Sequence, residues 1–135
     1  MSTVANNLNV NTVLRCAANY ANRRNTFVFR LMPARPIAEL RRAIDLFRTS
    51  DYSSAAGFLV ENVLCRDTTA EYYHMALCYI SRCFARTGDL AAARRVAGEI
   101  ARIKLPPNYA RTASELVDEV QTDLAACERN FKSRS

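Results

Sequence analysis

Two segments of the chain, 38 residues apart, carry the same pattern of a helix end, a tight turn and a new helix start. Arg48–Ala55 (RTSDYSSA) aligns with Arg86–Ala93 (RTGDLAAA), and the match continues to Glu61 and Glu99. Periods of 20–50 residues are typical of folds that stack one supersecondary unit repeatedly. The sequence therefore predicts two copies of a helical hairpin, each with an Asp placed to cap its second helix.

Upstream of the two turns, the alignment shifts by one residue, which predicts a first turn one residue shorter than the second. The pairs that match at a displacement of 37 are Leu40 with Leu77, Ala43 with Ile80, and Phe47 with Phe84. Only three Gly and four Pro occur in 135 residues, a composition that favours helix. We expect an all-α fold of stacked antiparallel helical hairpins with flanking capping helices.

A chain of this length fits one domain. We expect a loose tail over 1–10, a helix over 11–24 with a short segment reaching 32, two hairpins over 37–107 and a capping helix over 110–131. Within the hairpins the apolar spacing predicts helices at 37–48, 52–65, 69–86 and 90–104. The alternation over 25–32 suggests a short extended piece. Thr112 and Glu115 have the spacing of a capping box at the start of the last helix.

The second hairpin resembles a tetratricopeptide repeat, and the likeness covers residues 37–107. Its matching positions are Leu77, Ile80, Ser81, Phe84, Gly88, Asp89, Ala93, Ala97 and Pro106. The first hairpin resembles the family less closely, through Leu40, Ala43, Phe47, Asp51, Tyr52 and Ala55. Another family of α-hairpin repeats, or a plain helical bundle, also fits the periodicity.

The excess positive charge lies in the first third of the chain. The net charge is +6, and residues 1–50 hold eight Arg against Glu39 and Asp45, which is also +6. Arginine offers a planar fork of donors suited to carboxylate or phosphate. A genome whose base composition favours Arg codons would give the same bias.

The resemblance implies a binding surface, because the first helices of tetratricopeptide repeats line the concave side where extended peptides lie. It places five residues there: Arg41, Arg48, Tyr79, Arg82 and Arg86. Such a face would bind an acidic or C-terminal segment of another protein, as an adaptor or scaffold does. The alternative is that these arginines are solvated and paired with Glu39, Asp45 or Glu71.

A second hypothesis is nucleic-acid binding, above all of RNA, through the Arg-rich first third. Its candidate residues are Arg15, Arg23, Arg24, Arg30, Arg35 and Arg42, with Phe27 and Phe29 nearby for base stacking. A third hypothesis is a structural subunit that forms a homo-oligomer, since the apolar strip Phe27–Phe29 could drive self-association.

Sequence support for enzymatic chemistry is absent. His74 and Cys78 form an i, i+4 pair, but no third metal ligand has supporting spacing, so we interpret them as packed core residues. Glu115, Asp118 and Glu119 are expected on the solvated face of the last helix. We therefore expect no catalytic residue, no metal and no cofactor.

The five cysteines are scattered, odd in number and without a C-x-x-C pair. They are interpreted as small buried hydrophobes of an intracellular protein, in the cytoplasm or nucleus, with regulatory redox chemistry as the alternative. The sequence shows no secretory signal and no apolar run long enough to span a membrane. We expect no membrane association.

Overall fold

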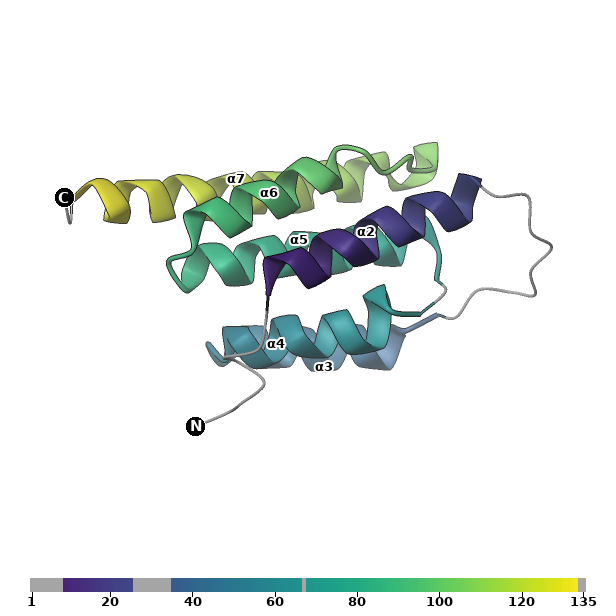
Figure 1. The fold of residues 1–135 in the computed structure, drawn as a ribbon, viewed down its shortest axis with the longest axis horizontal. Coiled ribbons are helices and arrows are strands. Elements are labelled where there is room, and N and C mark those ends of the chain that lie inside the picture. The colour runs from purple at the N-terminus through teal and green to yellow at the C-terminus, as the bar shows by residue number, and fades with distance from the viewer. Residues whose placement is uncertain (1–8, 26–34, 67, 134–135) are drawn as a thin grey trace.

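The computed structural model describes residues 9–25, 35–66 and 68–133, and the regular elements in these ranges are helices, which confirms the all-α prediction (Figure 1). The short element η1 is a π-helix and η2 is a 3₁₀ helix. In chain order the elements are α2 (Val10–Asn25), α3 (Ile37–Arg48), α4 (Tyr52–Leu59), η1 (Val60–Leu64), α5 (Ala70–Arg86), α6 (Leu90–Ile100), η2 (Pro107–Tyr109) and α7 (Ala110–Ser133).

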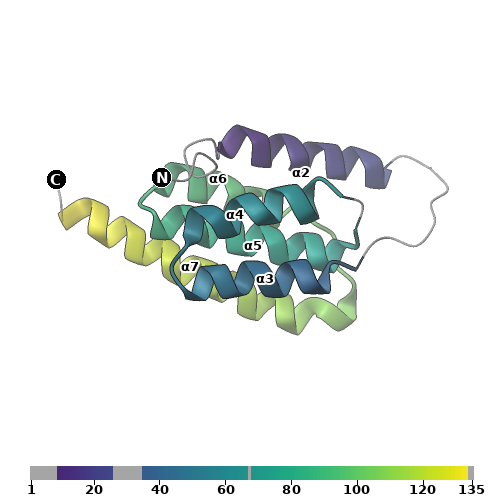
Figure 2. The same ribbon diagram turned by 90° about the horizontal axis from the view of Figure 1, so that it is seen from below.

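The helices form a stack with α5 at its centre. In Figure 1 the hairpin of α3 and α4 lies below α5, and α6 and α7 lie above it. Helices α3, α5 and α7 run in one direction, from right to left, while α2, α4 and α6 run in the other. Figure 2, from below, shows α3 and α4 in front of α5, and α2 packs beside them against α6 and η1.

The two hairpin turns close through the same backbone hydrogen bonds. Asp51 N donates to Leu46 O and Asp89 N donates to Phe84 O, each at 2.9 Å, so donor and acceptor are both displaced by 38 residues. The turns therefore have equal length, and the prediction of a shorter first turn is wrong. Aligning Phe47 with Phe84 matched residue type, whereas the phase of the helix pairs Phe84 with Leu46.

One residue in each turn adopts a positive φ, 67° at Ser50 and 89° at Gly88. Glycine reaches this region without steric cost, whereas serine is strained there. The Asp89 side chain accepts a hydrogen bond from Ala92 N at 3.1 Å, as an N-cap does, while the Asp51 side chain makes no such bond. The first turn thus keeps the backbone of the second with less favourable residues.

Small residues lie where the two helices of each hairpin meet. Ala55 and Ala93, displaced by 38, are both buried within 1% of full burial. Ser81 is also fully buried, and its Oγ donates to Ala93 O at 2.9 Å, which joins α5 to α6. These side chains allow the backbones of a hairpin to approach closely.

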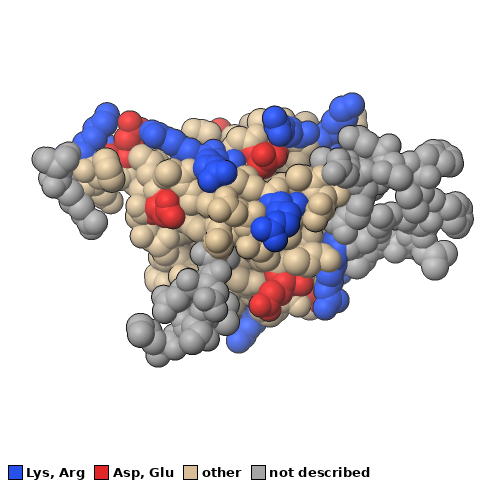
Figure 3. Space-filling view, in the orientation of Figure 1, with Lys and Arg blue, Asp and Glu red and all other residues tan. Residues whose placement is uncertain are grey.

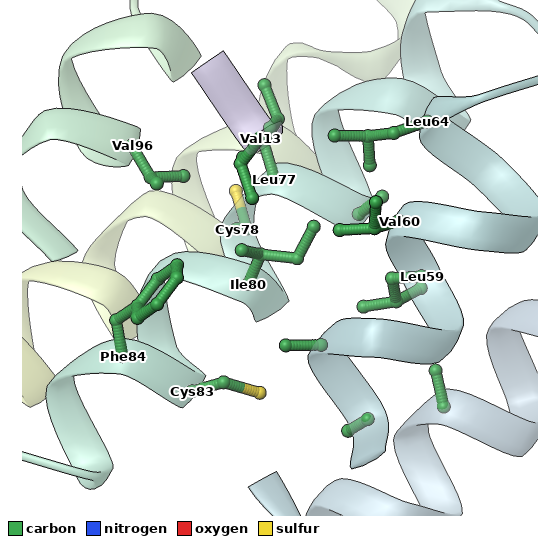
Figure 4. Close-up of a cluster of buried hydrophobic side chains, with 14 of the residues drawn as sticks. Val13, Leu59, Val60, Leu64, Leu77, Cys78, Ile80, Cys83, Phe84 and Val96 are labelled. Atoms are coloured by element: carbon green, nitrogen blue, oxygen red, sulfur yellow. The ribbon is translucent and has the colours of Figure 1, made fainter. Parts of the chain in front are cut away.

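The core lies on both sides of α5, which confirms that this nearly all-apolar helix is central. Figure 4 shows its side chains meeting those of α4, η1, α6 and α2. The labelled residues that are less than 2% exposed are Val13, Leu59, Val63's neighbour Leu64, Leu77, Cys78, Ile80 and Val96.

Several predicted boundaries differ from the structure. The helix expected over 52–65 changes to a π-helix at Val60, where Asn62 Nδ2 donates to Phe58 O at 2.9 Å. The helix expected over 90–104 ends at Ile100 in a turn with i→i−3 bonds. The segment expected to be extended, 25–32, lies outside the described residues apart from its first, which ends α2.

The capping-box prediction for the last helix is wrong. Helix α7 begins at Ala110, directly after η2, so Thr112 lies inside the helix rather than at its N-cap. The 3₁₀ turn supplies the entry into the helix instead, through a hydrogen bond from Tyr109 N to Pro106 O at 3.0 Å. Among the described residues, no helix has the length and apolar content needed to cross a membrane.

Candidate functional site

Two arginines of α5 stack on one phenylalanine of α3, and two tyrosines surround it. The Cζ atoms of Arg82 and Arg86 lie 4.6 and 4.9 Å from the centroid of the Phe47 ring, which is buried. Tyr52 and Tyr79 meet the same ring edge-on, with centroids at 5.2 and 5.4 Å. Cation–π and edge-to-face contacts of this kind are favourable when partly desolvated. We call these five residues the arginine–aromatic cluster.

Helix α7 supplies the carboxylates that bind these arginines. Arg82 donates from Nε to Asp123 Oδ2 at 2.8 Å and from Nη1 to Glu119 Oε2 at 2.6 Å. Arg86 binds Asp123 with two donors, Nε to Oδ2 at 3.0 Å and Nη2 to Oδ1 at 3.3 Å. The hydrogen bonds from Arg86 to Asp123 raise the pKa of Arg86. The network joins α5 to α7.

The acidic partners were missed from the sequence. Asp123 is buried, with only 10% of its side chain exposed, although the whole acidic side of this helix was expected to be solvated. A signal was present, because Arg82 and Arg86 on α5 have the same i, i+4 spacing as Glu119 and Asp123 on α7. Two parallel helices with such matched spacing can pair both charges at once.

The five residues predicted to bind a partner therefore divide into two groups. Arg82, Arg86 and Tyr79 belong to the arginine–aromatic cluster, whereas Arg41 and Arg48 lie exposed on α3. In the described part of the chain, Arg41 and Arg48 form no ion pair, so the alternative of pairing with Glu39, Asp45 or Glu71 does not apply to them.

A partly exposed apolar strip runs along α5 beside these two arginines. Tyr72, Met75 and Tyr79 are spaced by three and four residues and are half-buried, so they share one side of the helix. Burial raises the pKa of Tyr79, and the nearby charges of Arg82 and then Arg48 oppose that rise. Arg48 is therefore close to the Tyr79 end of the strip.

Helix α3 contributes its own apolar residues between its two arginines. Ile37, Arg41, Ile44 and Arg48 follow at steps of four, three and four residues and so share one side of α3. Ile37 is 45% exposed. Because α3 and α5 run parallel (Figure 1), this side lies along the α5 strip. We call the combined surface the α3–α5 face: Ile37, Arg41, Ile44, Arg48, Tyr72, Met75 and Tyr79.

The residues predicted to bind nucleic acid do not gather in the described structure. Arg15 is exposed on α2, while Arg35 and Arg42 are exposed on or beside α3, in a different layer. The side chains of Arg23 and Arg24, and the whole of Arg30, lie outside the described residues. On the face that carries α2, α4 and α6, positive side chains are spread out with acidic ones among them (Figure 3).

His74 and Cys78 are buried and electrically neutral near pH 7. Cys78 Sγ lies 3.8 Å from His74 Nδ1, which is also 3.1 Å from the hydroxyl of Tyr109. Burial lowers the pKa of His74 and raises the pKa of Cys78 to about 12, so the pair is not a thiolate–imidazolium pair. Within the described ranges, no group of three or more His, Cys, Asp or Glu side chains could hold a metal ion.

Only part of the cysteine prediction holds. Cys78, Cys83 and Cys127 are buried as expected, but Cys65 is exposed and Cys16 is half-buried. The Sγ atoms of Cys16 and Cys65 lie 3.9 Å apart, although 49 residues separate them.

A cavity of about 400 Å³ lies between α2, α5 and the end of α6. The rings of Tyr20 and Tyr73, which stack with centroids 3.9 Å apart, line it together with Leu77, Arg102 and Lys104. None of the residues predicted for binding lines this cavity.

No protein-family model matches the chain, and no curated protein or solved structure matches it either. The fold itself is an all-α arrangement of several packed helices, compatible with a helical-repeat architecture.

Proposed function

We propose that this protein is a non-enzymatic interaction module that binds an acidic segment of a partner protein on the α3–α5 face. One observation carries the proposal. Arg41 and Arg48 form no ion pair in the described part of the chain, yet they flank the half-exposed apolar strip of Tyr72, Met75 and Tyr79. Unpaired arginines beside exposed tyrosines are typical of protein-binding surfaces.

The spacing of the two arginines suits a peptide. Seven residues of helix separate Arg41 from Arg48, which is about 10 Å along the axis. Two carboxylates three residues apart in an extended segment, or seven apart in a helix, span the same length. Each would accept charge-assisted hydrogen bonds from one guanidinium, while an apolar side chain between them packs on the tyrosines.

A tetratricopeptide-like assignment supports this choice of surface. Under that assignment α3 and α5 are the first helices of two successive units, and α7 takes the place of the first helix of a third. The concave side would then be the side that α3, α5 and α7 share. Arg82 and Arg86 have a structural role in this proposal, because α7 already occupies them, and partner binding falls to Arg41 and Arg48.

One nearby charge favours a protein over a nucleic acid on this face. Glu119 is 51% exposed, and its negative charge acts on Tyr79. A phosphate backbone laid along the tyrosine strip would meet this carboxylate, whereas a short peptide can place its acidic residues on the α3 side alone.

The test selects 12-residue acidic peptides from a displayed library on the purified protein, then measures their affinity by fluorescence anisotropy. The double variant Arg41→Ala with Arg48→Ala should weaken binding at least tenfold, because each lost charge-assisted hydrogen bond is worth about 1.5–3 kcal/mol. The matched control is Arg95→Ala with Arg129→Ala, which removes the same charge from exposed positions on α6 and α7.

A labelled 20-nucleotide single-stranded RNA serves as the competing probe. If it binds more tightly than any selected peptide, with an affinity that falls steeply as salt rises, the protein is a nucleic-acid binder and the proposal is wrong. Equal peptide affinity for the wild type and the α3 double variant would also contradict it.

A further inference from the structure

Two cysteines from distant parts of the chain meet at the contact between α2 and η1. Cys16 lies in the middle of α2, and Cys65 follows the last residue of η1. Their Sγ atoms are 3.9 Å apart, against about 2.05 Å in a disulfide. The two sulfurs therefore need to approach by about 2 Å, a small displacement for side chains at a helix–helix contact.

The surroundings allow that approach and give an oxidant access. Cys65 is exposed and stands outside the regular helix, where its N–H closes the π-turn onto Val60 O at 3.1 Å. A change of rotamer at Cys65 relocates its sulfur without moving the backbone. Cys16 is half-buried and faces it from α2.

We propose that Cys16 and Cys65 form a reversible intramolecular disulfide when a hydroperoxide oxidises the protein. The Cys65 thiolate attacks one peroxide oxygen, so an S–O bond forms, the O–O bond breaks, and hydroxide leaves to become water on taking up a proton. The Cys16 thiol then attacks the sulfenic sulfur, and water leaves as the S–S bond forms. Two thiols lose two electrons and two protons, and hydrogen peroxide becomes two waters.

The remaining cysteines are protected from the same chemistry. Burial raises the pKa of Cys78 and of Cys83 to about 12, so neither supplies the thiolate that the reaction needs. Cys127 is buried beneath α7. The site is therefore selective for one pair among five thiols.

The disulfide would act as a covalent tie between α2 and the first hairpin. Without it, α2 is held on the stack by packing, chiefly of Val13, Ala17 and Tyr20. With it, α2 cannot leave the stack unless the bond is reduced. Intracellular disulfides are usually transient and redox-sensing, and a thiol reductant would restore the free pair by exchange. This inference does not depend on the proposed function.

The test treats the full-length protein with hydrogen peroxide, removes the excess with catalase, and alkylates the remaining thiols before mass spectrometry. The wild type should lose 2 Da and yield a cross-linked peptide pair containing Cys16 and Cys65. Its Tm should rise by about 5–10 °C relative to the reduced form. Dithiothreitol should reverse both changes.

Three single variants separate the alternatives. Cys16→Ala should stop at a dimedone-reactive sulfenic acid on Cys65, and Cys65→Ala should leave Cys16 alkylatable. Cys127→Ala is the control and should behave as the wild type does. A wild-type product in which Cys16 stays alkylatable would overturn the proposal, whether Cys65 is over-oxidised or joined to a second molecule.

Discussion

Arg82 donates from Nε to Asp123 Oδ2 at 2.8 Å, and this bond joins two helices whose partners lie 41 residues apart in sequence. Asp123 also receives both donors of Arg86, so one carboxylate serves two guanidinium groups. Since α7 packs on the stack beside α5, the attachment of the last helix depends strongly on this residue.

Replacing Asp123 should therefore loosen α7. Asp123→Ala leaves two arginines without their shared carboxylate, at an expected cost of about 2–3 kcal/mol in the free energy of unfolding. Glu119→Ala is the matched control, since Glu119 is 51% exposed and its single ion pair should contribute below about 1 kcal/mol. Urea unfolding of the two variants measures the difference, and equal losses would contradict this account of α7.

Phe47 is the second residue on which the cluster depends. Phe47→Ala removes a buried ring together with the surface on which both guanidinium groups stack, and should cost about 3–4 kcal/mol. Phe131→Ala provides the comparison, because that ring is 64% exposed and its loss should change stability by less than about 0.5 kcal/mol. Thermal unfolding followed by circular dichroism distinguishes the two.

The two hairpin turns predict opposite effects for exchanged residues. Gly88→Ser should destabilise by about 1 kcal/mol, since φ is 89° there. An added Cβ meets no atom within 4 Å, so this cost is conformational. Ser50→Gly should stabilise slightly, by about 0.5 kcal/mol, because relief of the strained φ outweighs the added freedom of the unfolded chain. Denaturant midpoints of the two variants should shift in opposite directions.

His74 predicts a dependence of stability on pH. Burial lowers its pKa in the folded state below the value of about 6.5 that it has in the unfolded chain. Above pH 6.5 the imidazole is neutral in both states and its contribution is constant. As the pH falls from 6.5 towards the lower folded pKa, only the unfolded state takes up the proton, so stability falls by at most about 1.4 kcal/mol per pH unit.

The variant His74→Gln should show a shallower decline over this range, because glutamine does not titrate. Unfolding free energies at pH 7.5, 6.5 and 5.5 for both proteins make the comparison. A decline equally steep in the variant would assign the pH dependence to other groups.

The local part of the fold was predictable from sequence. Apolar spacing marks α3, α4, α5 and α6, and the matched turns at Asp51 and Asp89 mark where each hairpin reverses. These features depend on neighbouring residues, so they remain legible in one dimension. The relation between Ser50 and Gly88 was less visible, because backbone geometry and not side-chain type is what the two positions share.

The candidate site was only partly predictable, because it depends on which helices meet. Arg41 and Arg82 look alike in sequence, yet one is exposed on α3 and the other is bound by α7. Long-range pairing also brings Cys16 to Cys65. Neither relation has a local signal, although the matched spacing of Glu119 and Asp123 was a usable hint.

The recurrence of one turn after 38 residues makes the hairpin a unit of length as well as of structure. An Asp follows the positive-φ residue in both turns, so a copy of residues 51–88 inserted after Gly88 would meet the same residue type at both junctions. Repeat stability grows with each added interface between neighbours. The chain can thus lengthen by whole hairpins, with each reversal of direction made by the hydrogen bonds that it already uses twice.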